Sequence, residues 1–222
     1  LSQRGIMKIN KAARMMNMSR KIIITISRQY GSAGRIIGQR LAKELGIAFY
    51  DREFLEDITK KLGVSGDFFR DDNRGEDGMY EVSRTRMNPL ATVTSLSVNL
   101  EVYESAASLI RSIAQRESAV IVGRCADYVL KDEKNVLSLF LYAEKKDRIR
   151  RGIELYHVDE RHAQETMERF DRKRARFYEY YTDRKWGALS NYDMMINTSR
   201  MGIDQCVRFL RDAAREMMDA ED

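Results

Sequence analysis

A glycine-bearing loop between a strand pattern and a helix pattern is the first part of the sequence whose residues could do chemistry. Residues 22–26 are apolar and mostly β-branched, and such a run predicts a buried strand of a parallel sheet. The loop that follows carries Gly31 and Gly34, and a helix pattern continues from it to Gly46. Glycines let backbone N–H groups approach an anion, and the start of a helix favours negative charge. This arrangement is therefore suited to binding phosphate.

The loop fits the phosphate-loop pattern G-x-x-x-x-G-K-[ST] only in part. Gly34 takes the place of the second glycine, and Arg35 that of the lysine, so a planar guanidinium would reach the phosphate oxygens. Gln29 replaces the first glycine, and Ile36 and Ile37 stand where the magnesium-binding hydroxyl is expected. An ordinary turn between a strand and a helix explains the same residues, so both interpretations stay open at this point.

The size and composition of the chain are those of a soluble globular protein. Its 222 residues are 33% charged and 43% hydrophobic, and we expect an N-terminal arm over residues 1–20 and a single domain over 21–222. A net charge of +5 suits a polyanionic ligand, either a nucleotide or a nucleic acid. Cys125 and Cys206 form no disulfide framework or metal pattern, which favours a reducing cytoplasm. No apolar run reaches the roughly 18 residues of a spanning helix, so we expect no membrane association.

Strand patterns alternate with helix patterns along the rest of the chain. Beyond 22–26, strands are expected at 47–51, 119–123, 136–142 and 193–198. Beyond the helix that ends at Gly46, helices are expected at 52–62, 99–116, 144–155 and 204–217. Alternation of this kind predicts an α/β domain with a mainly parallel sheet, which binds ligands at the carboxyl ends of its strands.

Three features are expected to meet at that edge of the sheet. They are the glycine loop, Asp51 at the end of the second strand, and Arg124 directly after the strand at 119–123. Their convergence favours a phosphate-ligand site over an ordinary turn. Asp51 is compatible with two roles, since it could position an acceptor or magnesium, or cap the helix that follows.

The order and spacing of several segments resemble the nucleoside monophosphate kinases, and most closely the cytidylate kinase-like family. The similar segments are 27–35, 49–53, 120–124, 139–143, 171–174 and 191–199. The resemblance implies a three-layer α/β/α P-loop kinase fold with a five-stranded parallel sheet, a substrate-binding insert at about 63–98 and a short helical lid at about 157–182. It also implies a phosphotransferase that moves the γ-phosphoryl group of ATP, with Mg²⁺, to a nucleoside monophosphate. CMP or dCMP is the default acceptor.

The resemblance also assigns roles to individual residues. Those expected to bind ATP are Tyr30, Gly31, Ser32, Ala33, Gly34, Arg35 and Ile36. Arg124 and Arg174 would hold the acceptor phosphate, with Asp171 orienting them, and these three with Arg35 form the expected catalytic set. Because position 36 lacks a hydroxyl, Ser32 or Asp51 is the candidate magnesium ligand.

Some positions depart from the family's pattern. A second lid arginine, expected one turn before Asp171, is Met167 here, and Arg169 or Arg172 could compensate for it. Residues 63–98 show no cytosine-reading segment, so the acceptor base stays open. The aromatic residues of the lid region could stack on a base or pack the lid against the domain. These are Phe177, Tyr178, Tyr180, Tyr181 and Trp186.

Other functions on the same scaffold remain open as well. A kinase for another small-molecule acceptor is one alternative, and an inactive nucleotide sensor or nucleic-acid-binding protein is another. The missing hydroxyl favours the second of these. Nucleic acid is nevertheless not the expected partner, because the basic residues concentrate in the lid-like segment at 157–182 and form no extended stripe. The sequence does not define an oligomeric state.

Overall fold

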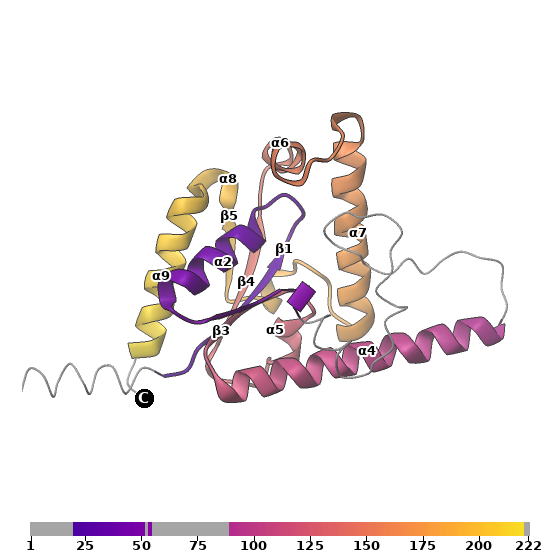
Figure 1. The fold of residues 1–222 in the computed structure, drawn as a ribbon, viewed down its shortest axis with the longest axis horizontal. Helices are drawn as coiled ribbons and strands as arrows, with labels where there is room; N and C mark the ends of the chain where they lie inside the picture. Colours follow the sequence, from indigo (N-terminus) through magenta and orange to yellow (C-terminus); the bar gives the residue numbers. More distant parts are fainter. Residues whose placement is uncertain (1–19, 52, 55–88, 220–222) are drawn as a thin grey trace, which may run out of the picture.

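The structure, a computed structural model, describes residues 20–51, 53–54 and 89–219 and contains a five-stranded parallel sheet (Figure 1). The strands are β1 (Ile23–Arg28), β2 (Ala48–Tyr50), β3 (Ala119–Val122), β4 (Val136–Tyr142) and β5 (Met194–Asn197). Their order in the sheet is β2-β3-β1-β4-β5. The predicted α/β fold with five parallel strands is confirmed, with strand boundaries within two residues of those expected.

Strand β1 lies in the centre of the sheet, which explains its apolar sequence. It pairs with β3 on one side and with β4 on the other. Residues 22–26 are all buried because both faces of this strand are covered. The loop after β1 therefore starts at the middle of the carboxyl edge, between the ends of β3 and β4.

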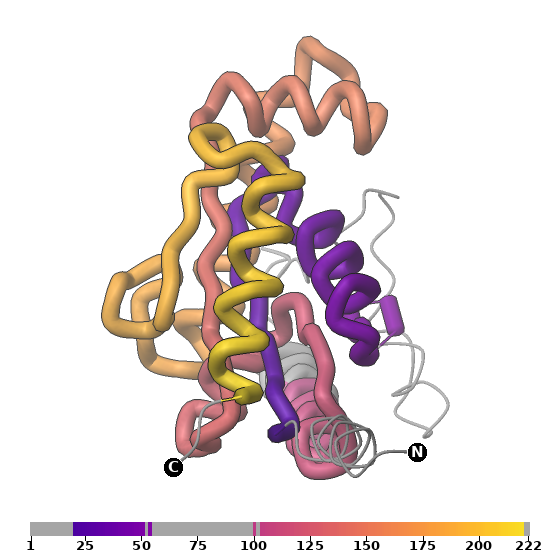
Figure 2. The backbone as a smooth tube through the Cα atoms, turned by 90° about the vertical axis from the view of Figure 1, so that its left-hand side faces the viewer, coloured from indigo at the N-terminus to yellow at the C-terminus, as the bar shows by residue number. Residues whose placement is uncertain are grey.

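Helices cover both faces of the sheet, and alternate residues of β1 pack against each layer. Ile24 and Ile26 belong to the core with α2 (Gly34–Leu45) and α9 (Ile203–Asp219). Figure 2 shows these two helices side by side. On the opposite face, Ile23 packs with residues of α4 (Pro89–Arg116) and α5 (Ala126–Val129). The side chains therefore follow the period of two that is expected of a strand.

The remaining helical elements follow β4 in the chain, and the first of them, α6 (Lys145–Tyr156), begins at the carboxyl end of that strand (Figure 1). The others are η2 (Glu160–His162), α7 (Ala163–Thr182), η3 (Leu189–Asn191) and α8 (Thr198–Met201). Helices α6 and α7 pack against each other. None of the helices described is both long and apolar enough to cross a membrane.

One boundary differs from the sequence expectation. Helix α4 begins at Pro89, ten residues before the expected start at 99, so the last part of the expected insert is helical. Proline suits the first helical position because its missing N–H has no partner there. The rest of the expected insert, most of the expected helix at 52–62 and nearly all of the N-terminal arm lie outside the described residues.

Candidate functional site

The loop between β1 and α2 has the backbone geometry of an anion cradle. Gly31 has a φ of 72°, and a Cβ there would collide with the carbonyl group of Arg148, so glycine is required. Ala33 precedes α2 with a φ of 64°. No side chain caps the start of α2, and its first turn carries no acidic residue. A helix start without a side-chain cap is suited to binding an anion.

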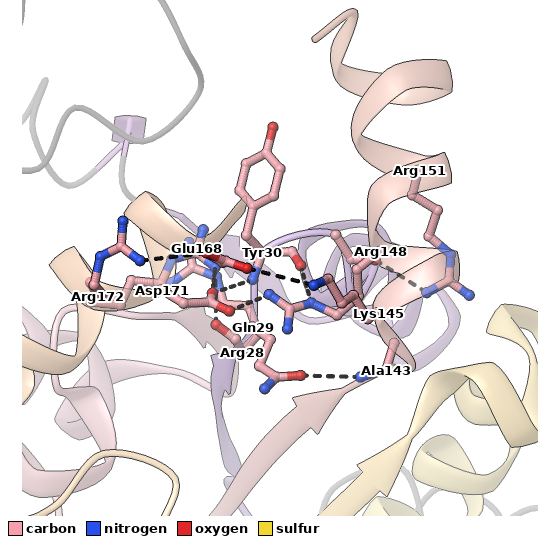
Figure 3. Close-up of polar contacts among 12 residues, drawn as sticks. Arg28, Gln29, Tyr30, Ala143, Lys145, Arg148, Arg151, Glu168, Asp171 and Arg172 are labelled. Carbon is pink, nitrogen blue, oxygen red and sulfur yellow. Dashed lines mark hydrogen bonds and ion pairs between the residues drawn. The ribbon is translucent and has the colours of Figure 1, made fainter. Parts of the chain in front are cut away.

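Groups outside the loop bind its carbonyl oxygens (Figure 3). The carbonyls are those of residues 30–32. Arg148 Nε donates to the first at 2.7 Å, Arg151 Nη1 to the second at 3.2 Å, and Thr198 Oγ1 to the third at 2.9 Å. Because each peptide is planar and trans, fixing a carbonyl on one side turns the next N–H to the opposite side. The α6 arginines thus help to set the direction of the loop's donors.

Sequence reasoning missed Arg148 and Arg151, both of which are buried. They lie in α6, a helix rich in basic residues to which no role was assigned from the sequence. Arg148 forms an ion pair with Asp171, whereas Arg151 donates, within the described residues, to neutral oxygens of Gly31 and Thr198. Their spacing of three was the available signal, because it places both side chains on the same side of a helix.

The predicted lid acid Asp171 contacts the loop directly. Its Oδ1 accepts a hydrogen bond from the backbone N–H of Tyr30 at 2.7 Å, while Oδ2 pairs with Arg148. Arg174, which the sequence placed on the same helix face, lies 3.9 Å from Asp171 and donates to the carbonyl of Arg28 at 3.0 Å. Asp171 therefore joins α7 to both the loop and α6.

The structure brings the predicted residues Arg35 and Asp51 together at the end of β2. Their side chains form an ion pair at 2.8 Å, and Glu53 accepts from the same guanidinium at 2.9 Å. Asp51 Oδ1 also accepts from the N–H of Phe54 at 3.2 Å. This hydrogen bond is the kind that a capping residue accepts, and the capping role of Asp51 stays a prediction because most of residues 52–62 lie outside the described part of the chain. The predicted contacts of both residues with phosphate or magnesium stay predictions.

A cavity that is open to solvent lies at the carboxyl ends of β1 and β3. Its lining includes the predicted residues Arg124 and Arg174. It also includes Arg28, for which no role was predicted. The described lining includes no Asp or Glu. The remaining lining residues are apolar, aromatic or small. A positively charged cavity of this kind suits an anionic ligand.

Aromatic residues of the lid region pack α7 against the domain and also line the cavity, whereas stacking on a base stays a prediction. Phe177, Tyr178 and Trp186 line the cavity, and the Arg124 guanidinium lies 5.7 Å from the centre of the Phe177 ring. Tyr181 instead stacks on Tyr103 of α4, with ring centres 4.2 Å apart. The aromatic cluster therefore packs α7 against the domain and also supplies part of the cavity wall.

A buried carboxylate stands behind the cavity wall. Asp127 is 6% exposed and accepts hydrogen bonds from Tyr178 at 2.6 Å and from Ser27 at 3.4 Å. Burial raises the pKa of Asp127 above its usual range, and the two hydroxyl donors oppose that shift. Asp127 thereby fixes Tyr178 and Ser27, both of which line the cavity.

The expected substitutes for Met167 do not reach the cavity. Met167 is buried beside Tyr30 and Phe170. Arg172 pairs with Glu168 at 3.7 Å, and neither it nor Arg169 is part of the cavity lining. The third guanidinium of the site comes instead from the end of the central strand.

Few groups in the described ranges could hold a metal ion. No cluster of three or more His, Cys, Asp or Glu side chains with that capacity occurs in them. The hydroxyl of Ser32 is fully buried and has no hydrogen-bond partner within the described part of the chain. Ser32 therefore fits a ligand at the loop better than Asp51, whose oxygens are already engaged.

Comparison with known proteins agrees with this geometry. Residues 23–200 match the sequence profile of the cytidylate kinase-like family. A solved structure of an uncharacterized protein from Eubacterium ventriosum ATCC 27560 is 25% identical, with a TM-score of 0.67 over 87% of this chain and 98% of that one. Shikimate kinase from Bacteroides thetaiotaomicron is 14% identical, with a TM-score of 0.50 over 86% and 97% of the two chains, which shows the shared fold alone. None of the curated proteins matches the sequence.

The family match covers most of the chain and carries the fold of P-loop kinases with it. Fold and family together support a phosphotransferase of the P-loop kinase type. The chain belongs to the cytidylate kinase-like family.

Proposed function

We propose that this P-loop kinase transfers the γ-phosphoryl group of ATP to a nucleoside monophosphate, with CMP or dCMP as the first acceptor to test. One observation carries the proposal. Arg124, from the end of β3, and Arg174, from α7, meet in one cavity beside the glycine loop. Arginine forks match the geometry of a phosphate group, and the described lining of the cavity contains no Asp or Glu, although Arg174 also lies 3.9 Å from Asp171 outside that lining.

The loop after β1 supports the donor half of the proposal. Its carbonyls are bound from outside, and the start of α2 is uncapped, which suits the phosphates of ATP. Residues 30–36 would hold the nucleotide. Arg35 would supply the charge of the usual lysine by exchanging its partly exposed ion pair with Asp51 for a phosphate oxygen.

Magnesium bound with the nucleotide would neutralise part of the phosphate charge. The buried hydroxyl of Ser32 is the protein group best suited to contact it. Magnesium commonly keeps several waters and is held largely by phosphates, so a site with few protein ligands is compatible with it.

The cavity supports the acceptor half of the proposal. Arg124 and Arg174 would bind the phosphate of the acceptor, while the rings of Phe177 and Trp186 provide an apolar wall for a base. Phosphoryl transfer depends mainly on positioning and charge neutralisation, so these groups suffice without a nucleophilic side chain. The hydrogen bond between Tyr30 and Asp171 would hold the loop that binds ATP in a fixed position relative to α7, which carries Arg174.

A carboxylate acceptor is the alternative that the same charges favour, since a guanidinium binds carboxylates as well as phosphates. The structural similarity to a shikimate kinase makes a small carboxylic acid a necessary member of any acceptor panel.

Equilibrium binding distinguishes these acceptors before turnover is measured. We expect CMP to bind at least ~10-fold more tightly than cytidine, because only CMP offers a phosphate to the arginines. Arg124→Ala and Arg174→Ala should each remove most of this preference. Arg150→Ala, at an exposed arginine paired with Asp147, is the matched control and should keep it. Equal binding of CMP and cytidine to the wild type would contradict the proposal.

A further inference from the structure

We propose that Arg28 is a further catalytic residue, which contacts the phosphoryl group as it passes from donor to acceptor. The inference rests on the proposed function and adds a group to it. Arg28 is the last residue of the central strand and lines the same cavity as Arg124 and Arg174. No role was predicted for Arg28 from the sequence.

The backbone of Arg28 is fixed on both sides. Its strand pairs with β4, where Arg28 stands in register with Leu141. Its carbonyl oxygen accepts a hydrogen bond at 3.0 Å from Nη1 of Arg174, which is itself 9% exposed. The side chain of Arg28 therefore starts from a rigid point, and a residue of the lid helix fixes that point.

Two glycines make room for the side chain of Arg28. A Cβ on Gly34 would lie 2.8 Å from the Cβ of Arg28 and 2.9 Å from its Cγ. A Cβ on Gly123 would lie 2.5 Å from Nη1 of the same arginine. The stem of Arg28 thus runs past the first residue of α2, and its guanidinium rests against the residue that precedes Arg124.

The side chain of Arg28 therefore extends from the proposed ATP site to the proposed acceptor site. Gly34 is the first residue of the helix whose N-terminal end suits the phosphates of the donor. Gly123 lies at the end of β3, where Arg124 is placed to bind the acceptor. A guanidinium that extends from the first point to the second occupies the region that the transferred group must cross.

The chemistry of the transfer gives a cation at this point a defined role. An oxygen of the acceptor phosphate forms a bond to the γ-phosphorus of ATP, while the bond from that phosphorus to the β,γ-bridging oxygen breaks. The electron pair of the broken bond leaves with ADP, and a nucleoside diphosphate is the other product. Negative charge spreads over the equatorial oxygens of the group in transit. Arg28 stabilises that charge more than it stabilises either bound substrate.

The test uses Arg28→Gln, Arg28→Lys and the exposed control Arg150→Gln in the full chain. Trp186, the single tryptophan, lines the cavity, so its fluorescence reports binding of CMP without turnover. Arg28→Gln should lower kcat by about 100-fold. The dissociation constants of CMP and ATP should stay within about fivefold of wild type. Arg28→Lys should recover part of kcat, because it restores the charge without the planar fork. Arg150→Gln should match the wild type.

The outcomes separate the two proposals. If the wild type turns over CMP and the kcat of Arg28→Gln is within about threefold of the wild-type value, the role of Arg28 is overturned and the proposed function stands. A wild type that shows neither turnover nor a fluorescence change with any nucleoside monophosphate overturns the proposed function and this inference together. If Arg28→Gln does not unfold cooperatively on heating, Arg28→Lys decides the question, and an unchanged kcat in that variant overturns the inference.

Discussion

The carboxylate of Asp171 accepts a hydrogen bond from the backbone N–H of Tyr30 at 2.7 Å, and so joins helix α7 to the loop after the central strand. The same carboxylate pairs with the buried Arg148, which in turn donates to the carbonyl of Tyr30. A single residue of the loop, Tyr30, is thus held at both its N–H and its carbonyl group (Figure 3). The position of α7, and with it that of Arg174, depends on the loop.

Replacing Asp171 tests how much this connection stabilises the fold. Asp171→Asn keeps an oxygen that can accept from Tyr30 but leaves the charge of Arg148 without its partner. Removing one member of a buried ion pair should lower the free energy of unfolding by about 3 kcal/mol, measured by urea denaturation. Glu168→Gln, which alters two exposed ion pairs, one with Arg172 of α7 and one with Lys145 of α6, should change the free energy of unfolding by less than about 0.5 kcal/mol. Equal stability of the two variants would show that the Asp171 pair is not a structural link.

Arg151 is expected to affect nucleotide binding more than folding. Arg151→Met removes donors to the neutral oxygens of Gly31 and Thr198, so the free energy of unfolding should fall by about 1–2 kcal/mol. The affinity for ATP should fall by about tenfold, because the loop loses an anchor and a positive charge behind the phosphates. Calorimetric titration with ATP measures this. Arg150→Met is the matched control, and unchanged ATP affinity in Arg151→Met would refute the prediction.

The ion pair of Arg35 allows its phosphate role to be measured apart from stability. Because Arg35 is 38% exposed, Arg35→Ala should change the free energy of unfolding by less than about 1 kcal/mol. Its dissociation constant for ATP should nevertheless rise by about 100-fold if the guanidinium contacts phosphate. Glu53→Gln, which removes only the other partner of Arg35, should keep ATP affinity within about threefold. A similar loss in both variants would indicate that the ion-pair cluster matters, and not contact of Arg35 with phosphate.

The buried carboxyl of Asp127 predicts a pH dependence of stability. Burial raises the pKa of Asp127 in the folded protein, so the folded state binds a proton more readily than the unfolded chain does. The stabilisation from protonated Asp127 is therefore complete below about pH 4 and is lost as the pH rises through the folded pKa. Relative to Asp127→Asn, the wild type should lose stability between pH 4 and pH 8 in denaturation experiments. If the free energy of unfolding of the wild type instead rose relative to that of Asp127→Asn with increasing pH, the raised pKa of Asp127 would be contradicted.

The sequence was sufficient to predict the sheet and one pair of site residues. The continuous apolar run at 22–26 indicates a strand covered on both faces, and β1 is the centre of the sheet. Arg124 and Arg174 were paired through the family's motif, and the structure places both in one cavity. The sheet was predictable because the apolar pattern of residues 22–26 agrees with the burial of β1, and the two arginines were predictable because they match the family's motif.

Contacts between distant segments were not predictable in the same way. The pairing of Arg35 with Asp51 depends on how α2 and the end of β2 pack, which no spacing reveals. Helix α4 starts early at a stretch rich in Thr, Ser and Val, residues with weak helix propensity, so the pattern favoured a later start. The contacts of Arg148 and Arg151 with the loop carbonyls join segments more than a hundred residues apart, and the sequence around these arginines does not indicate them.

The measurement that tests the central claim most directly is ADP release from ATP and magnesium across a panel of acceptors. The panel contains the nucleoside monophosphates and a small carboxylic acid, each with the wild type and with Arg124→Ala. We predict turnover that depends on a nucleoside monophosphate and falls by at least ~100-fold in Arg124→Ala. No turnover with any nucleoside monophosphate, in a protein that binds ATP, would contradict the account.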